Sequence, residues 1–425
     1  MTTHRVRNLL LTAGSSLVGF YAFEAAKYKR VAAKGFDLVD PPAPGTSVFG
    51  RLCEALTEAP VRQGNRIQIL RNGCEIFPAM LDAIASAQTS VFFETYLYWT
   101  GDVIGPQLAH ALADKASAGR EVNVLLDATG AARIDRCLVG QIERAGGRVV
   151  WFRPPRWYTL DKLNNRTHRR LLVVDGHIGF TGGVGIADEW TGNCEDPQHW
   201  RETHVRVEGP VVRDLSGAFF EHWSEAANCI LTNLPKIGNF EDGVCAHVTR
   251  SSAAKDATDL EKLFYAAIAG SRERLWLTTG YFAPRQAFVD ALIAAVSRAV
   301  DVRILVNGPH NHREVARQAG QTCFAQLLKA GVRIFEYQKT FLHAKTLVID
   351  DSWATVGTNN FNNRSFALND EITLSTWDKS IAAELADHFL DDLDASIELD
   401  LEGWSKRPLA KRLVERATAL IKREL

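Results

Sequence analysis

The sequence lacks the basic excess that most proteins acting on nucleic acids carry. Its 49 Lys and Arg residues are offset by 50 Asp and Glu residues, so the formal net charge of the 425-residue chain is −1 at pH 7. A basic surplus neutralises the phosphates of DNA or RNA. We therefore expect no nucleic acid among the partners of this chain, although a local basic groove is compatible with a neutral total.

Paired cysteines are also absent from the sequence. The seven cysteines are scattered, their number is odd, and no two of them form a Cys-x-x-Cys pair. A disulfide framework or a structural zinc site needs cysteines at short, regular spacings. The pattern favours unpaired and mostly buried thiols, and we expect neither a metal site nor a cofactor.

The N-terminal apolar run is too short to cross a bilayer as a straight helix. Leu9–Phe23 contains 15 residues without charge, whereas a spanning helix needs about 20. A signal peptide is disfavoured because Glu24 and a basic cluster follow the run. We interpret residues 1–35 as an uncleaved membrane anchor or interfacial segment, with a helix packed on the protein's own body as the alternative.

The C-terminal residues 405–425 predict a basic amphipathic helix. Apolar residues recur there at helical spacing, and most of the basic residues lie off the apolar stripe. Such a helix either lies on a membrane or docks on its own domain, and the sequence favours neither interpretation.

Most of the remaining sequence consists of two related copies. The matching segments are Ile84–Tyr98 with Ile268–Phe282, Glu121–Ala131 with Asp301–Asn311, Ala145–Phe152 with Ala330–Tyr337, and Thr167–Asp175 with Leu342–Asp350. The offset falls from 185 to 175 between the last two pairs, which places ten extra residues inside Arg153–Arg166. We expect domains at residues 62–235 and 243–404, with the boundary near Asn233–Gly243.

Each copy alternates amphipathic helices with apolar strands. The runs VNVLLD and VRILVN, at equivalent places in the two copies, are typical of strands buried on both faces. This alternation predicts an α/β fold in which helices cover both faces of a largely parallel or mixed sheet.

One motif occurs at equivalent places in both copies. The pattern H-x-[KR]-x4-D comprises His168, Arg170 and Asp175 in the first copy and His343, Lys345 and Asp350 in the second. Chance alone predicts about 0.08 such matches in a chain of this composition. Six residues after each motif comes a glycine-containing segment, Gly182-Gly183-Val184-Gly185 or Gly357-Thr358-Asn359-Asn360. We expect its glycines to bring backbone close to a phosphate.

The motif residues are suited to transfer of a phosphodiester without a metal. On a strand, each histidine projects on the same face as the cation two residues later. Arg170 and Lys345 can neutralise phosphate oxygens, with Asn360 as a neutral donor. One imidazole can act as the nucleophile and the other as the proton donor. Glu202 and Glu371, at comparable distances downstream of their histidines, are candidates to orient the rings.

These motifs resemble those of the phospholipase D superfamily, and within it the bacterial cardiolipin synthases. The similarity extends from about Arg62 to Trp404 and includes VFFETYLYWTGD, FTGGVGIADEW, HWRETHVRVEGPVV and VGTNNFNNRSFALNDE. It implies two phospholipase D-like α/β sandwich domains, related by a pseudo-twofold axis, that form one bilobal unit with the active site at their seam.

The resemblance also implies a function. It implies a membrane-associated phosphatidyltransferase that converts phosphatidylglycerol into cardiolipin plus glycerol through a phosphohistidine intermediate. His168 corresponds to the usual nucleophile and His343 to the acid. The implied partners are a phospholipid, with phosphatidylglycerol favoured, and the inner membrane of a bacterial-type cell, with peripheral or N-terminally anchored attachment. No obligate protein partner is evident.

The sequence departs from the family pattern at two positions. Position 170 is Arg where the family has Lys, and position 185 is Gly where Asn is common. Since Arg still binds phosphate, we favour an active first copy. The alternatives are a phospholipid hydrolase, a metal-independent nuclease, or a decayed protein that only binds lipid.

Four further residues have open assignments. Asp175 and Asp350 belong to the candidate catalytic set, but we favour a structural role in which each bonds backbone at the end of its strand. Glu94 and Tyr96 are candidates to bind substrate together with the glycines, because ETYLYW ends a buried strand at the edge that carries the motif.

Overall fold

The computed structural model describes residues 35–99, 101–155, 164–232, 238–252, 258–311 and 314–408. The predicted N-terminal segment 1–35 and C-terminal helix 405–425 therefore lie almost entirely outside the described residues. The middle of Arg153–Arg166 and the first part of Asn233–Gly243 lie outside them as well. Within the described ranges, no helix is both long and apolar enough to cross a membrane.

Helices and strands alternate along both halves of the chain. Those of the first half are α2 (Ser47–Thr57), β1 (Arg62–Arg71), α3 (Asn72–Ser86), β2 (Ser90–Thr95), α4 (Ile104–Ser117), β3 (Glu121–Asp127), α5 (Arg136–Arg144), β4 (Arg148–Phe152), β5 (Leu171–Val174), β6 (Ile178–Gly182), the 3-10 helix η2 (Asp188–Trp190), β7 (Thr203–Glu208) and α6 (Val212–Ala227). Those of the second half are β8 (Val244–Ser251), α7 (Asp259–Gly270), β9 (Arg274–Thr278), β10 (Phe282–Ala283), α8 (Gln286–Ser297), β11 (Asp301–Asn307), α9 (Glu314–Gln321), α10 (Phe324–Lys329), β12 (Arg333–Tyr337), β13 (Thr346–Ile349), β14 (Trp353–Gly357), β15 (Phe361–Asn362), α11 (Asn363–Ala367), β16 (Glu371–Thr376), α12 (Lys379–Asp394), β17 (Ser396–Leu399) and α13 (Leu401–Ser405).

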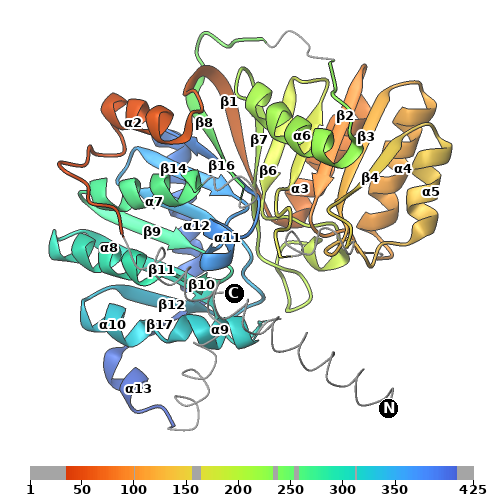
Figure 1. The fold of residues 1–425 in the computed structure, drawn as a ribbon. Helices are drawn as coiled ribbons and strands as arrows, with labels where there is room; N and C mark the ends of the chain where they lie inside the picture. Colours follow the sequence, from red (N-terminus) through yellow and green to blue (C-terminus); the bar gives the residue numbers. More distant parts are fainter. Residues whose placement is uncertain are drawn as a thin grey trace, which may run out of the picture.

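Among the described residues, fifteen strands form one continuous sheet that runs through both halves. Its order is β17-β12-β11-β9-β13-β14-β16-β8-β1-β7-β6-β5-β2-β3-β4. The halves meet where β1 and β8 pair antiparallel, with an irregular register between Arg62 and Asn65. Figure 1 shows the resulting two lobes side by side, with this seam between them.

The two halves repeat the same strand order outward from the seam. Beyond β1 come β7-β6-β5-β2-β3-β4, and beyond β8 come β16-β14-β13-β9-β11-β12, with β17 added at that outer edge. β2 and β9 begin 184 residues apart and β3 and β11 begin 180 apart, which are the offsets found in the sequence. The predicted α/β fold of two related halves is therefore confirmed.

The direction of the strands changes within each half. β2, β3 and β4 are parallel and connected by helices, whereas β5, β6 and β7 are antiparallel neighbours. β2 and β5 are buried along their whole length, as apolar central strands with helices on both sides should be. The predicted mixed sheet is thus present in both halves.

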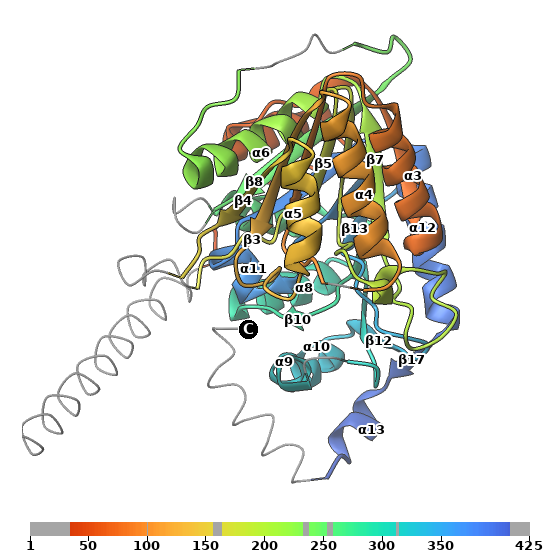
Figure 2. The ribbon, with the colours of Figure 1, turned by 90° about the vertical axis from the view of Figure 1, so that its right-hand side faces the viewer.

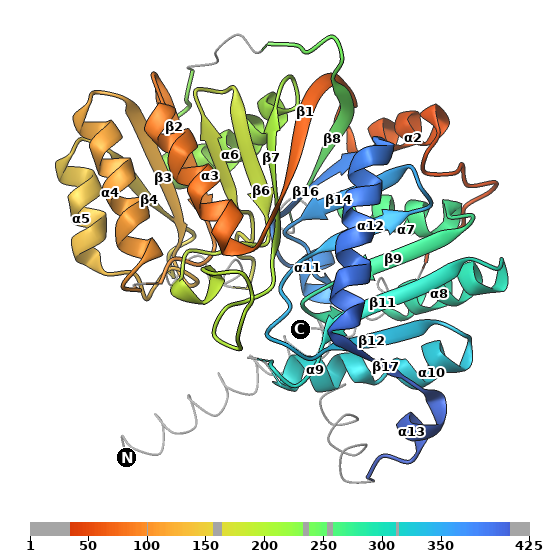
Figure 3. The ribbon, with the colours of Figure 1, turned by 180° about the vertical axis from the view of Figure 1, so that it is seen from behind.

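Helices cover both faces of the sheet, and the halves use the faces in opposite ways. One face carries α6 of the first half together with α7 and α8 of the second (Figure 1). The other carries α3, α4 and α5 of the first half together with α12 of the second (Figure 3). The view along the sheet shows α6 on one side and α3, α4 and α12 on the other (Figure 2). Equivalent helices of the two halves, such as α6 and α12, therefore lie on opposite faces of the sheet (Figure 1 and Figure 3).

Candidate active site

The two motif histidines lie at the seam, in extended segments that precede β5 and β13. The prediction that each histidine and cation stand within a strand was therefore slightly wrong, because β5 begins at Leu171 and β13 at Thr346. Each segment reaches across to the other half instead. The backbone N–H of His168 donates to the carbonyl of Asp370 at 2.8 Å, and that of His343 donates to the carbonyl of Arg201 at 2.8 Å.

These cross-connections are symmetric. Thr167 forms an isolated parallel bridge with Asp370, and Leu342 forms one with Arg201. Thr167 and Leu342 are equivalent positions of the repeat, 175 residues apart. The residue that follows each bridge partner is a glutamate, Glu371 after Asp370 and Glu202 after Arg201.

Each glutamate bonds the histidine of the opposite half. Glu371 Oε2 lies 2.9 Å from His168 Nδ1, and Glu202 Oε2 lies 2.6 Å from His343 Nδ1. The sequence indicated both glutamates as ring-orienting residues, but it associated each of them with the histidine upstream in its own copy. The structure exchanges the partners, so each motif histidine is paired with a carboxylate of the other half.

The two motif cations occupy equivalent places, each beside the histidine of its own motif. Arg170 Nη1 donates to the carbonyl of His168 at 2.8 Å, and Lys345 Nζ donates to the carbonyl of His343. All four side chains are buried. Both cations act electrostatically on both rings, and His168 acts on His343. The four groups therefore lie within electrostatic reach of one another.

The His168 ring is a neutral imidazole with one nitrogen directed away from its carboxylate. Burial and, after it, the nearby Arg170 and Lys345 lower the pKa of His168 to about 4, although Glu371 opposes this shift. Burial opposes the charge of Glu371, but His168 and hydrogen bonds from Thr358 and Ser365 outweigh it and lower the pKa of Glu371. The Nδ1–H of His168 can thus donate to the Glu371 carboxylate. The lone pair is then on Nε2, which lies 3.2 Å from Arg170 Nη2.

The His343 ring lies among aromatic side chains. Trp190 stands edge-on at a centroid distance of 5.3 Å, while Trp200 and Phe341 lie at 5.9 and 5.7 Å. Burial, followed by the charges of Lys345 and Arg170, lowers the pKa of His343 well below its ordinary value. Burial also raises the pKa of Glu202. Burial therefore disfavours the charged forms of both Glu202 and His343.

The cations differ in how easily they lose their charge. Burial lowers the pKa of Lys345 to about 7, against the opposing effect of Glu202. Burial also lowers the pKa of Arg170, but from a much higher ordinary value. Arg170 Nε has no hydrogen-bond partner among the described residues, and an unpaired buried donor is suited to an anionic ligand.

The glycine-containing segments explain one departure from the family pattern. A Cβ at Gly185 would stand 3.0 Å from the indole of Trp190. Trp190 Nε1 in turn donates to Glu202 Oε2 at 3.2 Å. Position 185 is therefore glycine because the indole occupies the space beside it and supplies a donor to the carboxylate. Trp190 was missed as a site residue, although it belongs to the segment FTGGVGIADEW that carried the resemblance.

The same segments support the two carboxylates differently. A Cβ at Gly183 would overlap Oε1 of Glu202, so glycine is needed there for the carboxylate to approach. At the equivalent position of the second half, the hydroxyl of Thr358 donates to Glu371. Gly182 and Gly357 end β6 and β14 and lie against His204 and Thr373. The glycines remain predicted to bring backbone close to a phosphate, and in this structure side chains of the neighbouring strand lie against them.

The aspartates of the motif lie at the other end of their strands. Asp175 accepts hydrogen bonds from the backbone N–H groups of Gln88, Thr89 and Ser90 at 2.7–2.8 Å. Asp350 accepts from those of Arg272, Glu273 and Arg274 at 2.8–3.3 Å. Each aspartate thus ties the end of β5 or β13 to the start of β2 or β9, as the structural alternative predicted.

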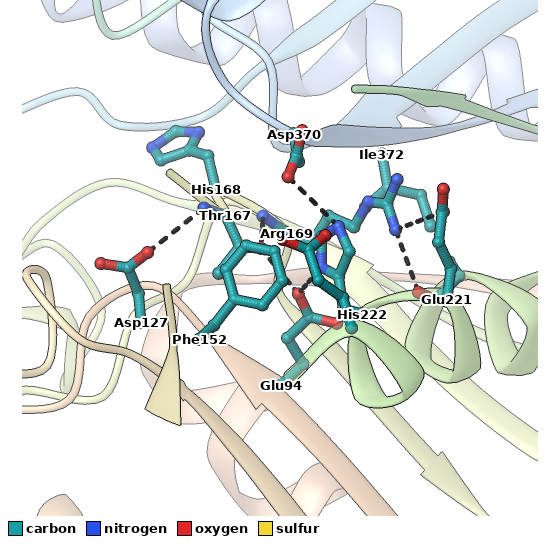
Figure 4. Close-up of polar contacts among 12 residues, drawn as sticks. Glu94, Asp127, Phe152, Thr167, His168, Arg169, Glu221, His222, Asp370 and Ile372 are labelled. Carbon is teal, nitrogen blue, oxygen red and sulfur yellow. Dashed lines mark hydrogen bonds and ion pairs between the residues drawn. The ribbon is translucent and has the colours of Figure 1, made fainter. Parts of the chain in front are cut away.

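Glu94 and Tyr96 end the first apolar strand but have different surroundings. The Tyr96 ring lies 5.3 Å from that of His168. Glu94 is fully buried behind that histidine, where its Oε1 accepts from Thr167 Oγ1 and contacts His222 Nδ1, both at 2.6 Å. Figure 4 shows Glu94, His222 and Asp370 in line behind the backbone of Thr167 and His168. Of the two, only Tyr96 is placed to meet a ligand at the histidine.

Asn360 lies beside the second-half motif. Its Oδ1 is buried without a hydrogen-bond partner among the described residues, and its backbone N–H donates to Ser365 Oγ at 3.0 Å. Across the described ranges, no three His, Cys, Asp or Glu side chains form a cluster that could hold a metal ion.

Comparison with known proteins identifies relatives over most of the chain. A family model described as "Cardiolipin synthase, PLD-like domain" matches residues 80–223 and 264–393. Cardiolipin synthase A of Pseudomonas fluorescens (strain SBW25) is 35% identical over 373 residues, which cover 87% of this chain and 77% of the relative. Cardiolipin synthase 2 of Bacillus anthracis is 32% identical over 376 residues, which cover 87% of this chain and 73% of the relative.

A solved structure shares the fold at low sequence identity. The phosphatidylserine synthase of Haemophilus influenzae Rd KW20 superposes with a TM-score of 0.66 at 15% identity, over 89% of this chain and 100% of that chain. The two matched ranges of the family model fall within the two halves of the sheet.

Proposed function

Because the chain belongs to the cardiolipin synthase family of phospholipase D-like proteins, we propose that it catalyses phosphatidyl transfer at the seam of its two halves. It is an enzyme of the cardiolipin synthase type that acts on phospholipids. One observation supports the mechanism: each histidine bonds a carboxylate of the opposite half, and Arg170 and Lys345 each bond the histidine of their own motif.

In the first step His168 acts as the nucleophile on a phosphatidylglycerol. Its Nε2 lone pair forms a bond to phosphorus, and the bond from phosphorus to the glycerol oxygen breaks. Arg170 and Lys345 neutralise the charge on the phosphate oxygens, which would otherwise repel the attacking lone pair. A proton from His343 reaches the departing glycerol oxygen, so glycerol leaves as a neutral alcohol.

In the second step the headgroup hydroxyl of another phosphatidylglycerol attacks the phosphohistidine. His343 accepts the proton of this hydroxyl, the new P–O bond forms and the P–N bond breaks. The product is cardiolipin, and both histidines return to their starting protonation states. Splitting the transfer into two displacements lets one phosphate site serve both the departing and the incoming alcohol.

The assignment of roles rests on the different surroundings of the two rings. Glu371 is stabilised as a carboxylate, so it holds the proton of His168 on Nδ1 and leaves Nε2 nucleophilic. Glu202 has a raised pKa, so it shares a proton with His343 and supplies the acid. The negative charge of a bound diester offsets Arg170 and Lys345, which raises the proton affinity of His343 when substrate is present.

The lipid substrates require the enzyme to work at a membrane. We assign it to the inner membrane of a bacterial-type cell, with residues 1–35 as the attachment segment, although these residues lie almost entirely outside the described ranges. The basic run after Leu9–Phe23 favours contact with anionic headgroups. Phosphatidylglycerol, the proposed substrate, is itself such a lipid.

A product assay tests the proposal. Purified full-length protein in phosphatidylglycerol vesicles should release glycerol and form cardiolipin in equal amounts. Phosphatidic acid plus glycerol would show that water replaces the lipid acceptor, and the absence of any product would contradict the proposal. Rapid quenching with labelled lipid should trap the phosphatidyl group on His168, where label on His343 would reverse the assigned roles.

A further inference from the structure

His222 connects two buried carboxylates directly behind His168. It lies on α6 and is 1% exposed. Its Nδ1 stands 2.6 Å from Glu94 Oε1, and its Nε2 stands 3.3 Å from Asp370 Oδ2 as an ion-pair contact. Glu94 belongs to β2 of the first half, whereas Asp370 precedes β16 of the second. The imidazole thus bridges the halves (Figure 4).

Glu94 and Asp370 are themselves attached to the chain on either side of the His168 ring, Glu94 through its carboxylate and Asp370 through its backbone. Thr167, the residue before His168, donates its hydroxyl to the same Glu94 oxygen that His222 contacts. The backbone carbonyl of Asp370 accepts the backbone N–H of His168, and the next residue, Glu371, bonds the ring. A displacement of the Glu94 carboxylate or of the Asp370 backbone would therefore move the backbone of His168 relative to the group that orients its ring.

We propose that His222 is a positioning residue for His168: as an imidazolium it holds Glu94 and Asp370 together and so keeps the ring aligned with Glu371. This inference rests on the proposed role of His168 as the nucleophile. His222 touches no reacting atom in this scheme, and its effect reaches the phosphate only through Thr167, Glu94, Asp370 and Glu371.

The charges around His222 favour its cationic form. Glu94 and Asp370 are fully buried. The other charged groups near the ring are Arg169 and Arg153, and Arg153 Nη1 lies 2.8 Å from Asp370 Oδ2. Burial and Arg169 act against protonation, but Glu94 and Asp370 outweigh both and raise the pKa of His222. A neutral ring would leave Glu94 as a buried carboxylate whose other oxygen, Oε2, has no partner among the described residues.

The pseudo-twofold relation provides an internal comparison. Arg201, the equivalent of Asp370, pairs with Asp392 of α12 at 2.9 Å. In both halves the residue at this position thus pairs with a helix on the sheet, Asp370 with His222 of α6 and Arg201 with Asp392 of α12. The acidic and basic partners are exchanged between the two pairs. The cation behind His343 is an arginine, which keeps its charge at all working pH values, whereas the cation behind His168 is a histidine.

The test compares three variants of the full-length enzyme in mixed micelles. H222Q removes the charge while keeping a polar side chain, and E94Q added to it removes the carboxylate that the charge balances. H247Q is the control, because His247 is equally buried but bonds Thr57 at the outer part of the seam. We expect H222Q to lower kcat by about 10- to 100-fold with little change in KM, and H222Q/E94Q to recover most of the loss.

A spectroscopic measurement separates positioning from general loss of structure. In ¹⁵N-histidine-labelled enzyme without substrate, His222 should carry protons on both nitrogens at pH 7, and His168 should be neutral with its proton on Nδ1. In H222Q the His168 signals should shift to those of a mixture of tautomers, while the His343 signals stay unchanged. In H247Q the His168 signals should stay unchanged as well.

Several results would overturn the inference. These are a neutral His222 in the wild-type enzyme, wild-type kcat in H222Q, a loss shared equally by H247Q, or unchanged His168 signals in H222Q. The wild-type spectrum decides the question even if the variants do not fold. An active H168A variant would instead refute the proposed function, since the inference about His222 predicts nothing about that variant.

Discussion

The two halves of the sheet have the same strand order but surround their histidines with different chemistry. Behind His168 lies a charged network that contains Glu94, His222 and Asp370. Around His343 lie the rings of Trp190, Trp200 and Phe341. The difference shows that a duplicated motif need not give duplicated roles, because the pKa of each ring follows from its surroundings.

The carboxylates show the same divergence at closer range. Thr358 supplies a hydroxyl to Glu371, whereas Gly183 makes room for Glu202 and leaves Trp190 to supply the donor. Gly183 and Gly185 are each matched by a neighbouring side chain, the Glu202 carboxylate and the Trp190 indole. This match argues against the interpretation that the first half has decayed.

The largest expected effect would come from removing either histidine. H168A and H343A should each lower kcat/KM by at least about 10,000-fold, because one loses the nucleophile and the other the proton donor. The comparison is sharpened by trapping: H343A should still accumulate some labelled phosphohistidine, whereas H168A should form none. Equal labelling in both variants would break the assignment of different roles.

The exchanged carboxylates should have the next largest effect. E371Q should lower kcat by about 100- to 10,000-fold, because an amide no longer fixes the tautomer of His168, and E202Q should act similarly through His343. Steady-state kinetics measures both effects. E398Q is the matched control and should leave kcat unchanged. It removes the charge of an exposed glutamate on β17 that pairs with Arg333 of β12.

The pH dependence should distinguish the two cations. kcat/KM should rise with pH through about 4, where His168 becomes neutral, and fall as pH rises through about 7, where Lys345 loses its charge. In K345R the alkaline limb should move upward, since arginine stays charged. R170K should lower kcat/KM by about 10-fold through loss of its forked donors. An alkaline limb that K345R leaves in place would contradict this explanation.

A smaller effect is expected from the donors to the two carboxylates. T358V removes the hydroxyl that bonds Glu371, and W190F removes the indole N–H that bonds Glu202. Each should lower kcat about 10-fold, since a hydrogen bond to a charged group contributes about 1.5–3 kcal/mol. If W190F had no effect while T358V did, the tryptophan would serve only to fill space beside Gly185.

The smallest effect on catalysis should come from the motif aspartates. D175N and D350N should keep kcat within about threefold of the wild-type value, because neither side chain reaches the histidines. Each should lower the free energy of unfolding by about 1–3 kcal/mol through weaker bonds to backbone N–H groups, measured by chemical denaturation. A large loss of kcat without loss of stability would show direct catalysis.

Much of the fold was accessible from sequence because the repeat was preserved. The offsets of 184 and 180 residues recur in β2 with β9 and in β3 with β11. Apolar runs such as VNVLLD appear as buried strands because a run without polar residues fits only a covered sheet. The pairing of β1 with β8 at the seam was not predicted, because neither strand lies in the matching segments that revealed the repeat.

Parts of the site could not be predicted, for a related reason. His168 with Arg170, and His343 with Lys345, were found because each pair is two residues apart in a motif that occurs in both copies. The crossing of Glu371 to His168 depends on bridges between the halves, and the approach of Trp190 to Glu202 depends on the absence of a Cβ at two glycines. His222 gave no signal at all, because a single histidine on an amphipathic helix resembles any other buried histidine.

The sequence by itself determined that this protein is a duplicated α/β enzyme with two histidine–cation motifs. Periodicity and repetition are properties of the chain, so they can be found without coordinates. Only the tertiary structure decided which carboxylate holds which ring, what surrounds each ring, and therefore how the two imidazoles differ. The bonds between these histidines and their carboxylates join residues more than 120 positions apart, and their effect on charge arises from burial at the seam.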